Sequence, residues 1–209
     1  MKSFINFTGM AALAVVMVAL AASTAEASPA KKDLRASYDG CGVTKGCFGT
    51  PSRCLETRDC LAVITYAKAD TGYAMEIFGV VAAGVNDVYI AGGLSFDTKM
   101  EYTSVTACRN YRGVHVDVVQ AFNDKGHANH VLSDPMLGLS NVTASHVDDE
   151  LYCSFTREAS LEIEGLTFDL DNDVFYLEVA KGDLAITGAL THHTNKAVSP
   201  DAVSLGDFP

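Results

Sequence analysis

The sequence has no tryptophan, few basic residues and, beyond its first 22 residues, no long apolar run. Without tryptophan, the aromatic platform of a sugar site would have to come from tyrosine or phenylalanine, which weighs against carbohydrate as the ligand. The 15 lysines and arginines stand against 26 aspartates and glutamates, giving a net charge of −11. An acidic surface argues against nucleic acid and anionic membranes as partners. No later segment reaches the roughly 20 apolar residues that a spanning helix needs, so we expect no transmembrane segment in the mature chain.

The beginning of the chain has the three parts of a cleavable secretory signal peptide. Lys2 supplies the positive charge, residues 11–22 form an uninterrupted apolar run, and Ala25-Glu26-Ala27 is a small-x-small cleavage site. The alternatives are a membrane anchor or a core helix, but the run is too short to span a bilayer. We therefore predict that residues 1–27 are a signal peptide and that the protein is secreted and extracellular.

The cysteine count agrees with export. All six cysteines follow the leader, at Cys41, Cys47, Cys54, Cys60, Cys108 and Cys153. An even number in an exported chain predicts three disulfides. A metal site built from the first four is the alternative, but their spacing is wider than the tight pairs of zinc ribbons. Asn141-Val142-Thr143 is a glycosylation sequon, so Asn141 is a predicted N-glycosylation site.

The remainder of the chain predicts one all-β domain. Residues 28–60 form a Gly-, Pro- and Cys-rich segment without clear period, which we expect to be a loop stapled to the domain at residues 61–209. From residue 61, short apolar runs recur between turn residues, as in a β-sandwich or barrel. The candidate strands are 61–68, 73–82, 87–94, 104–109, 114–122, 142–147, 151–157 and 174–180.

Several of these runs alternate with period two. In the last candidate strand, Phe175, Leu177 and Val179 fall on one face. Alternation of this kind predicts a strand with one buried face and one face in water.

Five motifs in order resemble the extracellular DOMON domain of ferric-chelate-reductase-like proteins. They are CGVTKGCFGTPSRC with a further cysteine at Cys60, VYIAGGLSFDTKM, SVTAC, ELYCSFTR, and ALTHHTNKAVSPDAVSLGDF near the C-terminus. Together they cover nearly all of the chain from Cys41 onward. The resemblance implies an immunoglobulin-like β-sandwich of the DOMON type, in agreement with the strand pattern.

The resemblance also implies a cofactor. Haem-binding DOMON domains hold b-type haem between a methionine and a histidine, and the matching positions here are Met100 and His193, with His192 as the fallback. Met/His ligation of the haem iron raises its reduction potential, and filled axial sites favour electron transfer. The sequence departs from the family pattern after the methionine, where Glu101 stands in place of a frequent glycine.

The resemblance further implies a bridge between Cys108 and Cys153, with Cys41, Cys47, Cys54 and Cys60 pairing among themselves. The bridge would close a loop of about 45 residues, worth roughly 4 kcal/mol in the chain-entropy model.

From these features we expect a secreted DOMON domain protein that binds b-type haem and transfers single electrons outside the cell. It would be an electron carrier or binding domain with a redox partner, rather than a complete reductase. The alternative is a haem-free extracellular module that binds a carbohydrate or protein ligand.

Overall fold

A computed structural model of the protein describes residues 37–82, 84–126 and 128–208. The predicted signal peptide, residues 1–27, lies outside the described residues. Among the helices described, none is long and apolar enough to cross a membrane.

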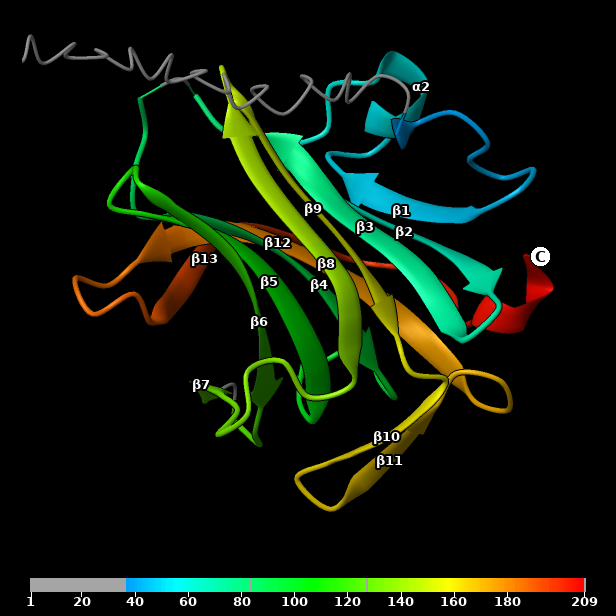
Figure 1. Cartoon of the computed structure of the whole chain (residues 1–209). Helices are drawn as coiled ribbons and strands as arrows, with labels where there is room; N and C mark the ends of the chain where they lie inside the picture. The colour runs from blue at the N-terminus through cyan, green and yellow to red at the C-terminus, as the bar shows by residue number, and fades with distance from the viewer. Residues whose placement is uncertain (1–36, 83, 127, 209) are drawn as a thin grey trace, which may run out of the picture. The chain divides into compact units, whose positions relative to one another are not determined.

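The described chain is built from two antiparallel sheets (Figure 1). The five-stranded sheet has the order β1 (Gly46–Thr50), β2 (Ala62–Ala69), β3 (Gly72–Val80), β9 (Glu150–Arg157), β8 (Leu139–Val147). The seven-stranded sheet has the order β13 (Leu190–Val198), β12 (Val174–Leu184), β4 (Val88–Ser95), β5 (Thr103–Tyr111), β6 (His115–Asn123), β7 (Asn129–Val131), with β14 (Val203–Ser204) also paired to β12. The predicted all-β sandwich is therefore confirmed.

Three short elements complete the described structure. A separate hairpin of β10 (Ser160–Ile163) and β11 (Leu166–Asp169) follows β9, and Figure 1 shows it projecting from the end of the sandwich. The one-turn helix α2 (Cys54–Thr57) follows β1, and the 3-10 turn η1 (Leu205–Asp207) follows β14.

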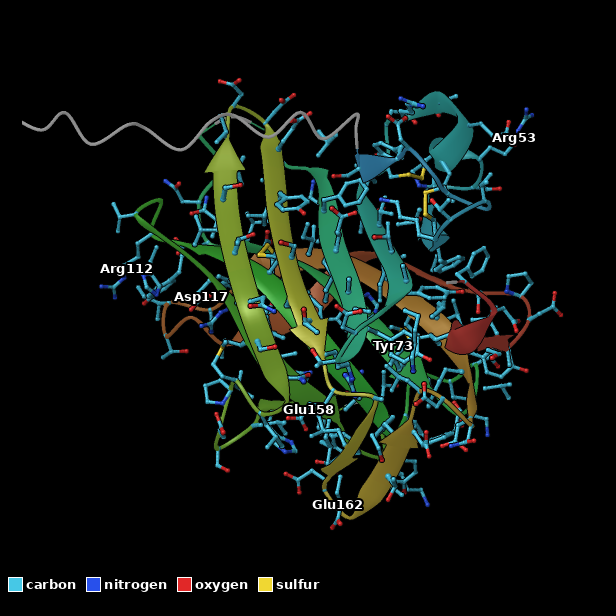
Figure 2. The ribbon with its side chains drawn as sticks, turned by 45° about the vertical axis from the view of Figure 1, so that its right-hand side comes forward. Arg53, Tyr73, Arg112, Asp117, Glu158 and Glu162 are labelled. Carbon is cyan, nitrogen blue, oxygen red and sulfur yellow. A yellow bond between two sulfur atoms is a disulfide. The ribbon has the colours of Figure 1, made fainter. Side chains whose placement is uncertain are left out.

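The cysteine-rich segment is more ordered than its composition suggests. It contributes the edge strand β1, which pairs along its whole length with β2, and the helix α2. Disulfides Cys41–Cys47 and Cys54–Cys60 brace these two elements, and Figure 2 shows them beside α2, where Arg53 is labelled. Tyr38 packs here on the outer side of the five-stranded sheet. The strand escaped prediction because Gly-Cys-Phe-Gly has no visible alternation.

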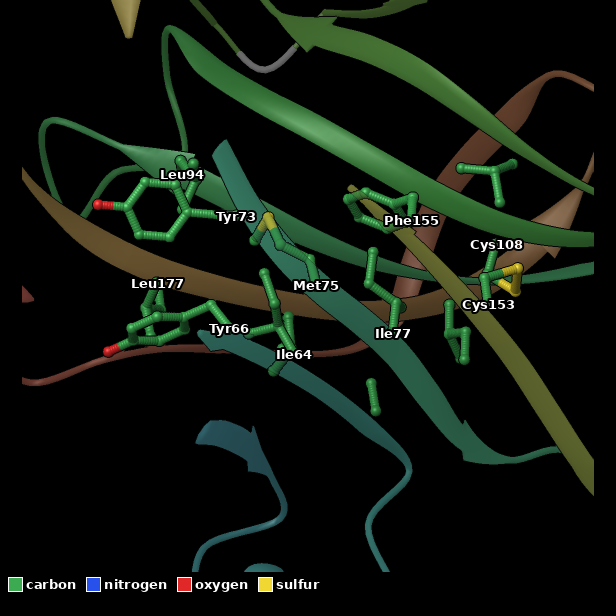
Figure 3. Close-up of a cluster of buried hydrophobic side chains, with 14 of the residues drawn as sticks. Ile64, Tyr66, Tyr73, Met75, Ile77, Leu94, Cys108, Cys153, Phe155 and Leu177 are labelled. Carbon is green, nitrogen blue, oxygen red and sulfur yellow. A yellow bond between two sulfur atoms is a disulfide. The ribbon is translucent and has the colours of Figure 1, made fainter. Parts of the chain in front are cut away.

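The main core lies between the two sheets. Alternate residues of each strand point inward, and they include Ile64, Tyr73, Ile77, Leu94 and Leu177 (Figure 3). Burial of this apolar surface is the main stabilising contribution, at roughly 25 cal/mol for each Å² removed from water.

The third disulfide, Cys108–Cys153, crosses this core from β5 to β9 and so joins the two sheets (Figure 3). The described chain thus contains the three disulfides expected from its even cysteine count, and it has no unpaired cysteine among the described residues.

The second face of β12 differs from the prediction. Phe175, Leu177 and Val179 do point into the core, but the opposite face is not in water, since Glu178 is 2 % exposed and Ala180 is 8 % exposed. All eight residues of the neighbouring β4 are also buried. Alternation identifies residues that share a face, but it does not determine whether that face is wet.

Candidate functional site

The outer face of the seven-stranded sheet contains a hollow of about 490 Å³. We call this side of the sandwich the cavity face. Residues of β4, β5, β12 and β13 line the hollow, together with Met100 from the β4–β5 loop and with Asn123, Gly126 and Asn129 around the β6–β7 connection. It thus unites segments that are up to about 100 residues apart in the sequence, as expected for a ligand site on a sandwich.

Small side chains form the floor of this hollow. Ala91, Val105 and Ala180 line it and belong to an apolar cluster separate from the main core. Gly93 continues the floor, and a Cβ atom there would lie 2.8 Å from Cγ2 of Thr103 and 3.2 Å from the side chain of Glu178. The absence of large side chains at these positions makes the hollow.

Met100 reaches the hollow through an unusual backbone conformation. Met100 and Tyr102 both have positive φ angles, 61° and 53°, in the left-handed region that non-glycine residues seldom occupy. Such conformations cost about 1–3 kcal/mol each and cluster at functional sites. Met100 stands among polar neighbours in sequence, yet only 7 % of it is exposed. The loop therefore turns a methionine inward at the expense of local backbone strain.

The side chain of the neighbouring Glu101 is hydrogen-bonded to the β6–β7 connection. Its Oε1 accepts a hydrogen bond of 3.0 Å from the backbone N–H of Gly126, and its carbonyl oxygen accepts one of 3.4 Å from Ser95 Oγ. Glu101, at the position where the family often has glycine, thus ties the Met100 loop to the β6–β7 connection.

Both histidines of the pair line the same hollow as Met100. Neighbouring residues of a regular strand point to opposite faces, but the β12–β13 pairing is irregular there. Its register shifts between Lys181 and Gly182 and again between Gly182 and Leu184. The ring centroids of His192 and His193 lie 4.3 Å apart, and His193 is the less exposed of the two.

Gly182 makes this approach of β13 possible. A Cβ atom at Gly182 would lie 2.8 Å from the ring of Tyr89 and 2.9 Å from the Cα of His193. Tyr89 in turn donates a hydrogen bond of 2.9 Å to the carbonyl of Thr191, and burial raises the pKa of its hydroxyl to about 12. The strand that carries the two imidazoles is therefore fixed by a tyrosine that fits against a glycine.

Glu178 is the site residue that sequence reasoning missed. It lies on β12 opposite Gly93 and lines the hollow, yet neither carboxylate oxygen has a hydrogen-bond partner. Burial raises the pKa of this carboxyl to about 8, with a further increase from Asp97 and opposing contributions from Thr103 and Ser95. The signal in the sequence was an acidic residue within the mostly apolar run 174–180.

The outer face of the five-stranded sheet, which we call the polar face, has a different character. It holds a shallower hollow of about 310 Å³. Within it, Glu76 accepts hydrogen bonds from Lys45 (2.8 Å), Thr65 (3.1 Å) and Tyr152 (2.7 Å). Asn141 is exposed at the edge of this face, at a β-bulge in β8, and donates to Thr156 Oγ1.

Two curated proteins are similar to this chain in sequence. One, from Drosophila melanogaster, is named as a homolog of ferric-chelate reductase 1 and is 31 % identical over 157 residues, covering 75 % of this chain and 24 % of the relative. The other, from Danio rerio, is named as ferric-chelate reductase 1 and is 28 % identical over 173 residues, covering 81 % of this chain and 28 % of the relative. The chain spans about a quarter of the length of these relatives. No protein-family model matches the sequence.

One solved structure has a similar fold. The cytochrome domain of cellobiose dehydrogenase from Myriococcum thermophilum superposes with a TM-score of 0.52 over 78 % of this chain and 83 % of that domain, at 11 % sequence identity. This similarity concerns the fold, which is the immunoglobulin-like β-sandwich of the DOMON type. The resemblance expected from the five motifs is thereby confirmed, in sequence by the two relatives and in fold by the cytochrome domain.

Proposed function

From its similarity to the DOMON domain of ferric-chelate-reductase-like proteins, we propose that this chain is an extracellular electron-transfer domain that binds one b-type haem on its cavity face. Met100 and His193 are the proposed axial ligands, and His192 is the fallback for the histidine. The single observation that carries the proposal is that these residues, remote in sequence, line one hollow with an apolar floor.

The residues around the hollow fit the chemistry of this group. A thioether and an imidazole are a ligand pair that haem proteins use for electron transfer. A floor of Ala91, Val105 and Ala180 suits a flat apolar macrocycle, since larger side chains there would fill the space. The strained loop at Met100 and the close fit of Tyr89 on Gly182 would hold the two ligands in place before the cofactor arrives.

When bound, haem would supply a one-electron couple with both axial positions filled by the protein. The residues of this chain would then exclude water through the buried floor and orient the ligands through the Glu101–Gly126 hydrogen bond. Electron exchange would require a redox partner that approaches the cavity face. The ferric-chelate reductase activity named for the relatives would therefore need components beyond this domain.

Secretion and glycosylation belong to the same proposal. The leader at residues 1–27 would direct export, and three disulfides suit an oxidising compartment. An N-linked glycan on Asn141 would lie at the edge of the polar face, away from the hollow that holds Met100.

A titration of the purified haem-free protein with haemin tests the proposal. We expect one equivalent to bind and to give the sharp Soret band of low-spin haem. Met100→Ala and His193→Ala should each lose the low-spin spectrum, and His192→Ala should retain it. Met136→Ala and His115→Ala are matched controls, because both side chains are exposed outside the hollow. A wild-type protein that ignores haemin would instead support the haem-free binding module.

A further inference from the structure

Glu178 is a buried acid at a site where a charged cofactor is proposed to sit. Its exposed fraction is 2 %, and both of its oxygens lack a hydrogen bond to any described residue. Burying an ionised carboxylate without such partners is costly, and proteins usually avoid it by protonation. A small change in the charge of its surroundings is therefore enough to change the protonation state of a carboxyl in this position.

The groups that face Glu178 come from three strands and one loop. Ser95 of β4 and Asp97 and Thr103 of the adjoining loop and strand lie on one side, and Lys196 of β13 lies on the other. Burial has the largest effect and raises the pKa of Glu178, and the negative charge of Asp97 raises it further. The nearby hydroxyls of Thr103 and Ser95 and the positive charge of Lys196 lower it. Tyr89, His192 and His193 line the same hollow and are the remaining titratable groups among its described lining residues.

We infer that Glu178 is the proton partner of the redox centre: its carboxylate gains a proton from solvent when the haem iron gains an electron from a one-electron donor. The inference rests on the proposed function. Ferric haem carries one more positive charge than ferrous haem, and an ionised Glu178 on the cavity wall stabilises that charge through a medium of low dielectric. Reduction removes the charge, and the carboxylate, again without a partner, takes up one proton. One electron and one proton thus enter together, and no bond other than the new O–H bond of Glu178 is formed.

The alternative is that Glu178 only shapes the hollow, as a side chain that fills the space left by Gly93. Glu178→Gln separates the two roles, because glutamine keeps the shape and removes the titration. Glu162→Gln is the matched control, since Glu162 is exposed on the β10–β11 hairpin (Figure 2).

The test is a spectroelectrochemical titration of the haem-loaded protein between pH 5 and pH 9. We expect the midpoint potential of the wild type to fall as pH rises, with a slope of up to about 59 mV per pH unit for one proton per electron. Glu178→Gln should give a flat profile at the high potential of the protonated form, and Glu162→Gln should follow the wild type. Redox-difference infrared spectra of the wild type should show a carboxylic-acid C=O band that appears on reduction.

Each outcome decides between the ideas. A red protein whose potential does not depend on pH, or whose slope survives in Glu178→Gln, overturns this inference and leaves the haem proposal intact. A protein that binds no haemin overturns the proposed function and this inference with it. If Glu178→Gln does not fold, the infrared band of the wild type still decides, because its absence contradicts protonation on reduction.

Discussion

The two outer faces of the sandwich share one core, but the glutamate on each face has a different environment. On the polar face, Glu76 accepts hydrogen bonds from Lys45, Thr65 and Tyr152. On the cavity face, Glu178 is more deeply buried and its oxygens have no hydrogen-bond partner. A carboxylate whose charge is already balanced stabilises the fold, whereas one without hydrogen-bond partners needs a separate explanation, for which the proposed cofactor is a candidate.

The floors of the two hollows differ in the same sense. Ala91, Val105 and Ala180 form a small apolar floor under the hollow of the cavity face, whereas hydrogen bonds from Lys45, Thr65 and Tyr152 to Glu76 cross the hollow of the polar face. An apolar recess with a few polar groups is typical of a ligand site, and a self-paired polar surface is typical of a face in contact with water. The difference between the faces therefore favours the cavity face as the side on which the proposed cofactor binds.

The largest expected effect on haem binding comes from filling the cavity floor. Ala91→Phe places a ring where the cofactor is proposed to lie, and we expect haem affinity to fall at least about 100-fold, or roughly 2.7 kcal/mol. Ala74→Phe is the counterpart on the polar face, where Ala74 is exposed, and should bind haem like the wild type. Haemin titration of both variants measures the difference, and equal affinities would contradict the assignment of the site to the cavity face.

Removing the bridge between the sheets should have a large effect on stability. Replacing both Cys108 and Cys153 by alanine opens a loop of 45 residues and should lower the free energy of unfolding by about 4 kcal/mol. Replacing Cys41 and Cys47, which are six residues apart, should cost only about 2 kcal/mol. Urea denaturation gives both values. Equal losses would mean that the bridge between the two sheets stabilises the protein no more than the bridge between Cys41 and Cys47.

Replacing each of the two glutamates by glutamine should change the free energy of unfolding in opposite directions. The pKa of Glu178 is raised from 4.5 to about 8, so the folded protein holds this proton more tightly than the unfolded chain. The contribution of protonated Glu178 to the free energy of unfolding is fully present below about pH 4.5. It is lost as pH rises toward 8, at up to about 1.4 kcal/mol per pH unit. Glu178→Gln should therefore stabilise the haem-free protein at pH 8 relative to the wild type, as measured by urea denaturation across this range.

Glu76→Gln provides the contrast on the polar face. It weakens charge-assisted hydrogen bonds to Lys45 and Tyr152, each worth roughly 1.5–3 kcal/mol, and should destabilise the protein at the same pH. If both variants shifted stability in the same direction, the distinction between a partnered and an unpartnered carboxylate would be wrong.

The smallest expected effect on folding concerns Asn141. In cells with a eukaryotic secretory pathway, Thr143→Ala and Asn141→Asp should lose an N-linked glycan, and Thr143→Ser should keep it because serine preserves the sequon. Mass spectrometry before and after enzymatic deglycosylation detects the difference. Because the site is exposed, we expect stability to change by no more than about 0.5 kcal/mol. An unmodified wild type would contradict the prediction that Asn141 on the polar face carries a glycan.

The sequence predicted eight of the strands, because each contains a short apolar run bounded by turn residues. It did not predict β13, whose Thr-His-His-Thr-Asn-Lys run is polar at the sheet edge. The resemblance carried by the ordered motifs predicted Met100 and His193 as a ligand pair, and both residues line one hollow in the structure. Glu178 was missed because a two-residue period cannot tell a face in water from a face that lines a cavity.

The irregular pairing of β13 has a consequence for the protein at high concentration. β13 is an edge strand of its sheet, and an exposed regular edge is a template on which another chain can add a strand. The register shifts around Gly182 break the even spacing of backbone donors and acceptors that such an addition requires. We therefore expect the irregular pairing that accompanies the two imidazoles at the hollow also to disfavour the addition of strands from other chains, and so aggregation through this edge.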